Sequence, residues 1–137
     1  MLHFRSQLCA VALLAGFGLA CDYTAAAAKG TCAAFAALDP DNDGTLDLNE
    51  ASQAASALFD KLDKDKEGTL SVGELQGRLS KKELAAGDPD KDKTLTKDEY
   101  LAIVAARFKA SDPDGEGTVD CREAKSQAGR ALMRLLK

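Results

Sequence analysis

The chain has 137 residues, enough for one domain with a modest core. It is 45% hydrophobic and 29% charged, and 22 acidic against 18 basic side chains give a formal charge of −4. The chain therefore has no excess of basic residues that could attract a nucleic-acid backbone, and nucleic acid is not expected as a partner. The acids are gathered in four clusters, and this uneven distribution is the most informative feature of the composition.

The first residues have the pattern of a secretory signal peptide. Arg5 without a nearby acid precedes the apolar run at 8–20, and small residues follow. The run is too short for a comfortable transmembrane span, and no other segment could cross a membrane. We predict a leader over 1–20 and an exported mature chain. The alternatives are cleavage as late as Ala28, lipid anchoring at Cys21, and a buried N-terminal helix.

Four cysteines are present, and their fate follows from the leader. Cys9 would be removed with it. If Cys21 is also removed or lipidated, Cys32 and Cys121 remain and could form a disulfide in an oxidising compartment. The alternatives are a third, unpaired thiol at Cys21, or two small buried thiols.

After the leader, a twelve-residue segment recurs four times without gaps, with starts 24, 25 and 24 residues apart. We number these segments loops 1 to 4; they cover residues 39–50, 63–74, 88–99 and 112–123. Four residues before each loop stands an apolar anchor: Phe35, Phe59, Leu84 or Phe108. All three prolines occupy loop position 2, where they disfavour continuation of a preceding helix.

The segments resemble the calcium loop of the EF-hand family, D-x-[DN]-x-[DN]-G-x5-E. The resemblance implies that side chains at positions 1, 3 and 5, the carbonyl at 7, position 9 (often through water) and Glu at 12 surround Ca²⁺. It also implies glycine at position 6, where the chain turns with positive φ, and a core aliphatic at 8.

Carried onto this chain, the resemblance implies a single four-loop domain over 29–137 with up to four calcium ions. The implied ligands are Asp39, Asp41, Asp43, Thr45, Asp47 and Glu50; Asp63, Asp65, Glu67, Thr69, Ser71 and Glu74; Asp88, Asp90, Asp92, Thr94, Thr96 and Glu99; and Asp112, Asp114, Glu116, Thr118, Asp120 and Glu123.

Only twelve or thirteen residues separate neighbouring loops, so one helix must leave one loop and enter the next. We predict an all-α array of about five short helices with short β-contacts between paired loops. A first helix over 32–38 would be capped by Thr31. Such helices hold consecutive loops at opposite ends, which predicts pairing of loops 1 with 3 and 2 with 4, against the usual pairing of neighbours. A capping box at Ser80 and Glu83 could break the helix between loops 2 and 3.

The net charge of each loop predicts the order of calcium affinity among the four sites. The net charges of loops 1 to 4 are −5, −2, −2 and −4, and affinity in this family rises with ligand charge. Loop 1 is therefore expected to bind most tightly, and loop 4 next. Lys93 replaces glycine at position 6 of loop 3. It removes no ligand but demands positive φ from a residue with a side chain, so loop 3 is expected to be weakest.

No enzyme is predicted. The only histidine, His3, lies in the leader, and no glycine-rich phosphate loop is present. Sensors of this family expose a Met-rich groove, but only Met133 would remain in the mature chain. We therefore predict a calcium buffer or a calcium-stabilised protein, with residues 132–136 in the core. A calcium-dependent sensor or interaction module is the alternative. Similarity to small exported bacterial EF-hand proteins implies a periplasmic location, with eukaryotic secretion as the alternative.

Overall fold

The computed structural model describes residues 32–137. Within this range it contains five helices and two small antiparallel sheets. In chain order the elements are β1 (Leu46–Asp47), α1 (Leu48–Leu62), β2 (Thr69–Ser71), α2 (Lys81–Gly87), β3 (Thr94–Thr96), α3 (Lys97–Ser111), β4 (Thr118–Val119), α4 (Cys121–Ala124) and α5 (Gln127–Met133). The predicted class, a helical array with short strand contacts between loops, is confirmed.

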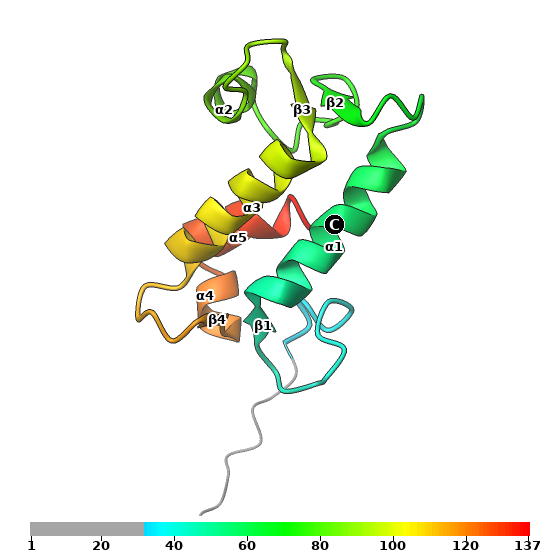
Figure 1. Cartoon of the computed structure of the whole chain (residues 1–137). Coiled ribbons are helices and arrows are strands. Elements are labelled where there is room, and N and C mark those ends of the chain that lie inside the picture. Colours follow the sequence, from blue (N-terminus) through cyan, green and yellow to red (C-terminus); the bar gives the residue numbers. More distant parts are fainter. Residues whose placement is uncertain (1–31) are drawn as a thin grey trace, which may run out of the picture.

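The two long helices, α1 and α3, lie side by side and run in opposite directions through the centre of the fold (Figure 1). Phe59 and Tyr100 pack edge to face between them, with ring centroids 5.8 Å apart. Lys97 at the start of α3 forms an ion pair with Asp60 at 2.6 Å. Each helix leaves one loop and enters the next. The prediction of shared helices is therefore confirmed for α1 and α3.

The strands show how the loops pair. β1 pairs with β4, placing Leu46 opposite Val119, and β2 pairs with β3, placing Leu70 opposite Leu95. All four side chains are fully buried. Loops 1 and 4 therefore form one end of the molecule, and loops 2 and 3 form the other (Figure 1). The predicted pairing of loops 1 with 3 and 2 with 4 is wrong, and loops 1 and 2 do not pair either.

The cause lies between loops 2 and 3, where a continuous helix was predicted and is not found. Turns cover residues 72–77, and they end at Gln76 and Gly77, whose φ angles are 49° and 78°. α2 then starts afresh from a capping box. The Ser80 N–H donates to Glu83 Oε2 at 2.7 Å, and the Glu83 N–H donates to Ser80 Oγ at 3.2 Å. The chain reverses here, so loop 3 returns to the end that holds loop 2.

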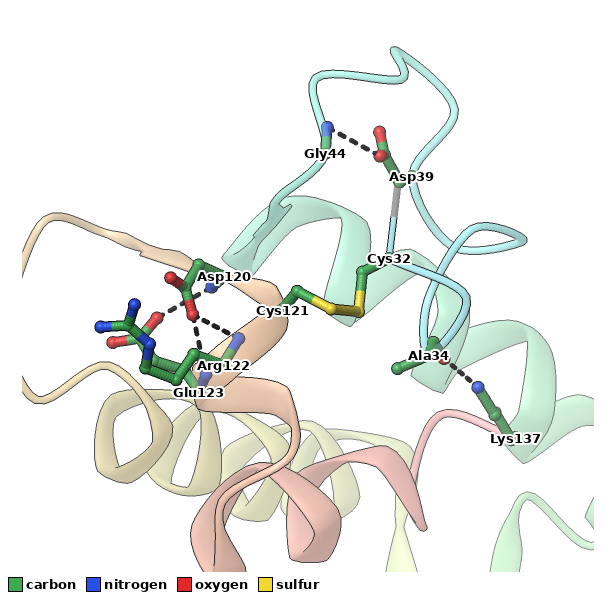
Figure 2. Close-up of a disulfide and its surroundings, with 9 residues drawn as sticks. All are labelled: Cys32, Ala34, Asp39, Gly44, Asp120, Cys121, Arg122, Glu123 and Lys137. Atoms are coloured by element: carbon green, nitrogen blue, oxygen red, sulfur yellow. Dashed lines mark hydrogen bonds between the residues drawn. A yellow bond between two sulfur atoms is a disulfide. The ribbon is translucent and has the colours of Figure 1, made fainter. Parts of the chain in front are cut away.

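The helix predicted over 32–38 is not found in the segment that enters loop 1. Residues 33–38 form turns, in which the N–H groups of Phe35 and Ala36 both donate to the carbonyl of Cys32. Phe35 is nevertheless fully buried. A disulfide joins Cys32 to Cys121 at the start of α4, which fastens this short segment to the far end of the sequence (Figure 2).

The C-terminal residues complete the core. Leu132, Met133, Leu135 and Leu136 are buried as predicted, whereas Arg134 within the same stretch is exposed. The Tyr100 hydroxyl donates to the carbonyl of Leu135 at 2.9 Å, and burial raises the pKa of Tyr100 to about 12. Lys137 Nζ donates to the carbonyl of Ala34 (Figure 2). The C-terminal segment therefore contacts both α3 and the segment that enters loop 1.

Several expectations fall on residues that the structure does not describe. These are the leader over 1–20, the alternatives of later cleavage, lipidation at Cys21 and a buried N-terminal helix, the thiols of Cys9 and Cys21, and the cap at Thr31. Over residues 32–137, none of the helices combines the length and the apolar character needed to cross a membrane.

Candidate metal centres in the four loops

Each loop is wound around the carboxylate at its first position. Oδ2 of that aspartate accepts a hydrogen bond from the backbone N–H at position 6, over 2.8–3.0 Å in all four loops. The donors are Gly44, Gly68, Lys93 and Gly117. Since an aspartate can accept from backbone donors a few residues ahead, this single side chain closes the turn that gathers the later ligands. All four repeats therefore share the same backbone arrangement around the aspartate at position 1.

Position 6 has a left-handed backbone in every loop. The φ angles are 83°, 81°, 72° and 88° at Gly44, Gly68, Lys93 and Gly117. The prediction that Lys93 adopts the conformation of a glycine is confirmed. Its side chain is exposed, and its N–H donates to Asp88 Oδ2 at 2.8 Å as the glycines do in their loops. Lysine at this position therefore strains loop 3 without changing its path.

The glutamate at position 12 is held by a reciprocal pair of hydrogen bonds of the capping-box type, which starts the following helix in loops 1, 3 and 4 and the turns at 72–77 in loop 2. One of its oxygens, Oε2, accepts from the N–H at position 9 over 2.8–3.0 Å in all four loops. In return, the side chain at position 9 accepts from the N–H at position 12. These pairs are Asp47 with Glu50, Ser71 with Glu74, Thr96 with Glu99, and Asp120 with Glu123.

Sequence reasoning assigned position 9 to the metal and missed this capping role. The signal was present, because an Asp, Ser or Thr three residues before a glutamate is the spacing of a capping box. The cap restricts the glutamate so that one oxygen is bonded to the backbone. In loop 1 the other oxygen, Glu50 Oε1, is buried and has no hydrogen-bond partner among the described residues. A buried oxygen without a partner is costly, and a cation would satisfy it.

The carboxylates converge in each loop. One oxygen from each of three acidic side chains lies within 4.8 Å of the other two. The groups are Asp39, Asp41 and Asp43; Asp63, Asp65 and Glu74; Asp88, Asp90 and Glu99; and Asp112, Asp114 and Glu123. Three like charges this close repel one another unless a cation or protons intervene. All-oxygen sites of this kind suit the hard cation Ca²⁺.

Other predicted ligands lie beside these groups with partners of their own. At position 5, Asp92 Oδ1 accepts from the N–H and the hydroxyl of Thr94, both at 2.7 Å, and Glu116 Oε1 accepts from the Thr118 hydroxyl at 3.1 Å. Glu67, also at position 5, stands outside the group in loop 2. The threonine carbonyls at position 7 belong to the backbone at or next to the short strands. Loop pairing therefore fixes their positions.

The two ends of the molecule differ electrostatically. Burial raises the pKa of Glu50, and the carboxylates of Asp47, Asp41 and Asp39 add to the effect. Burial likewise raises the pKa of Glu123 in the partner loop, again with neighbouring aspartates. The pKa of Glu74 is instead lowered, first by the hydrogen bonds from Ser71 and then by Lys64. Burial therefore dominates at the position-12 glutamates of loops 1 and 4, and hydrogen bonds dominate at that of loop 2.

One residue that supports loop 4 carries no ligand atom and was missed. Gly129 in α5 packs so closely on the end of loop 4 that an added Cβ would lie 2.1 Å from the carbonyl oxygen of Glu123 and 2.6 Å from Ala124 Cα. Any side chain there would push α5 away from the residue that closes the loop. Nothing in the sequence marked this glycine, because the contact depends on how α4 and α5 pack.

Comparison with known proteins agrees with this geometry. A family model described as EF hand matches residues 56–76, which cover the end of α1, loop 2 and the turns after it. A search of curated proteins gives no match. The matched loop has the same position-1 and position-12 hydrogen bonds as the other three, and each of the four gathers three carboxylates. The match over residues 56–76, with four acidic clusters arranged like EF-hand loops, supports an EF-hand calcium-binding protein.

Proposed function

We propose that the protein is an exported calcium buffer that binds up to four Ca²⁺ ions, one in each loop. The observation that carries the proposal is the convergence of three carboxylates within 4.8 Å in every loop, on the same backbone scaffold. The ligands would be the side chains at positions 1, 3, 5 and 12 with the carbonyl at 7, and position 9 would act through water. We assign no catalytic role, in keeping with the family.

The packing favours a buffer over a sensor. A sensor presents an apolar groove to its target when calcium binds. Here the apolar side chains of the C-terminal segment are buried, and among the described residues the exposed large hydrophobic side chains are Leu48 and Val72, at 42% and 37%. They belong to loops that lie at opposite ends of the molecule. The exposed large apolar side chains of residues 32–137 are therefore not gathered into one surface.

The loop pairing gives the proposed affinities a spatial order. The loops of highest net charge, −5 and −4, are loops 1 and 4, and these share the β1–β4 contact. The two loops of net charge −2 share the β2–β3 contact. Calcium binding should therefore occur in two phases, with the pair of loops 1 and 4 filling first and the pair of loops 2 and 3 filling at higher concentration.

Export is the remaining part of the proposal. It rests on the leader pattern of the first twenty residues and is supported by the Cys32–Cys121 disulfide, since such bonds persist in oxidising compartments. A periplasmic or secreted protein would experience free calcium well above cytosolic levels. Sites of moderate affinity would then suffice for buffering.

Titration calorimetry on the chain without its leader tests the function. The four variants Glu50→Gln, Glu74→Gln, Glu99→Gln and Glu123→Gln each remove one charge but keep the side-chain size. We expect loss of one tight ion from the first and last variants, and loss of one weak ion from the other two. Fewer than three ions bound by the wild type would contradict the four-site assignment. Calcium-dependent binding of an apolar dye would favour the sensor.

A further inference from the structure

A groove of about 860 Å³ lies outside the four loops, between the turn at 76–78 and the C-terminal segment that begins with α5. Arg78 lines it from the first segment, and Arg130 and Arg134 line it from the second. Ala131 and Met133 of the C-terminal segment also line it, although Met133 is largely buried. No Asp or Glu side chain of the described residues lines the groove, although acids outnumber bases in the chain.

Positive charge is concentrated in the C-terminal part of the sequence. Residues 124–137 contain four basic residues and no acid. Arg130 and Arg134 are one helical turn apart and are both exposed, so they project from the same face. Lys137 continues the spacing, but its ammonium group donates to the carbonyl of Ala34. The charge that faces the groove is therefore mainly that of the three arginines.

None of the three arginines of the groove forms an ion pair with an Asp or Glu side chain of residues 32–137, although Arg134 lies near enough to Glu83 to help lower the pKa of that carboxyl. The ion pairs in this range are Lys97 with Asp60 and Arg107 with Glu83. Arg78 donates to the main-chain oxygen of Lys137 at 3.1 Å and to the Gln76 side chain, and Arg130 donates to the carbonyl of Lys125. Each of these contacts uses only some of the five N–H groups that a guanidinium offers.

We propose that this groove binds an acidic peptide segment of a partner protein. Guanidinium groups match carboxylates with two parallel hydrogen bonds, and arginine clusters recognise acidic motifs. Three arginines from two separate segments can meet several carboxylates along a peptide. Ala131 beside them offers a small apolar contact for an aliphatic side chain. Charge complementarity therefore specifies the class of partner.

The shape of the site separates this proposal from other anionic partners. A single inorganic oxyanion would fill only a small part of 860 Å³. A lipid bilayer is flat on this scale and cannot follow a hollow lined by cations. An extended or helical peptide fits both the size and the concavity. Because the groove uses no loop ligand, the proposal stands or fails independently of the number of calcium ions bound.

Fluorescence anisotropy tests the proposal with the calcium-saturated full mature chain at physiological ionic strength. The probe is a labelled peptide of about ten residues, rich in Glu with interspersed Leu. The groove variant is Arg130→Glu with Arg134→Glu. The matched control is Lys81→Glu with Lys109→Glu, which makes the same change in net charge at exposed residues outside the groove. Arg130→Gln with Arg134→Gln provides a milder groove variant should charge reversal disturb folding.

We expect the charge-reversal groove variant to weaken peptide binding by about tenfold or more, and the control by about twofold or less. Equal losses in both would show non-specific attraction and overturn the proposal. So would equal affinity for a peptide with Lys in place of Glu. Two further outcomes would overturn it by reassigning the groove. Displacement of the peptide by inorganic phosphate would assign it to a small oxyanion, and arginine-dependent binding to phosphatidylglycerol vesicles without peptide binding would assign it to a membrane surface.

Discussion

Breaking the Cys32–Cys121 bridge, by replacing both cysteines with serine, should lower the free energy of unfolding. The bridge joins residues 89 apart in the sequence, and in the chain-entropy description a loop of this length is worth about 4.6 kcal/mol at 25 °C. Part of the native structure should survive, because Phe35 is fully buried and Lys137 bonds to the carbonyl of Ala34. We therefore expect a loss of about 2–4 kcal/mol.

The loss should also be uneven across the molecule. The bridge reaches the start of α4 beside the β1–β4 contact, while β2 and β3 lie at the opposite end (Figures 1 and 2). Opening should therefore become easier at loops 1 and 4, and the tighter pair of calcium sites should weaken more than the pair formed by loops 2 and 3. Reduction of the disulfide should therefore affect calcium binding in loops 1 and 4 more than in loops 2 and 3.

Two measurements check this expectation on the calcium-saturated protein. Urea unfolding gives the free-energy difference between the bridged protein and the double serine variant, and the wild type in reductant should match the variant. Native-state amide exchange compares β1 and β4 with β2 and β3. A loss below about 0.5 kcal/mol, within the range of ordinary surface substitutions, would refute the reasoning, as would equal acceleration of exchange at both ends.

Three further perturbations address single contacts. Lys93→Gly removes the strain of a φ of 72° and should tighten calcium binding in loop 3 by about 5–30-fold in calorimetry. Lys93→Gln is the control for charge, and equal effects of the two changes would rule out a backbone origin. Tyr100→Phe leaves the buried carbonyl of Leu135 without its donor and should cost about 1–3 kcal/mol in thermal unfolding; an unchanged melting temperature would contradict a role for that hydrogen bond. Glu83→Gln should destabilise the protein at neutral pH, because the N–H at the start of α2, the adjoining hydroxyl and Arg107 lower the pKa of Glu83. A carboxyl whose folded pKa is lowered stabilises the protein above its unfolded pKa of about 4.3, so the difference in unfolding free energy from wild type should shrink as the pH falls through and below that value. A difference independent of pH would exclude the charge as its source.

The loops could be predicted from the sequence because each is determined within twelve residues. The aspartate at position 1, the residue at position 6 and the capping box between positions 9 and 12 are joined by hydrogen bonds inside the loop. Even the unfavourable Lys93 does not divert the chain, since the same backbone hydrogen bond forms around it. Interactions within twelve residues can be recognised from the sequence, because they require particular residue types at fixed positions.

The pairing of the loops could not be predicted in the same way. It depended on whether the segment at 75–87 continued as one helix or restarted at Ser80. The short spacing between loops supported the first, and the capping box at Ser80 and Glu83 supported the second. The positive φ at Gln76 gave no warning in the sequence, because glutamine seldom adopts it. One local choice thus decided which loops meet at each end.

Shared helices and paired strands together join the four loops in a closed circuit. α1 connects loop 1 to loop 2, the β2–β3 contact connects loop 2 to loop 3, α3 connects loop 3 to loop 4, and the β1–β4 contact returns to loop 1 (Figure 1). A linear string of hands has two end members with a single neighbour, whereas every loop here has two. An ion that orders one loop therefore affects loops on both sides, and cutting one link leaves all four connected. The disulfide reinforces the link between the loops farthest apart in the sequence, where the circuit closes.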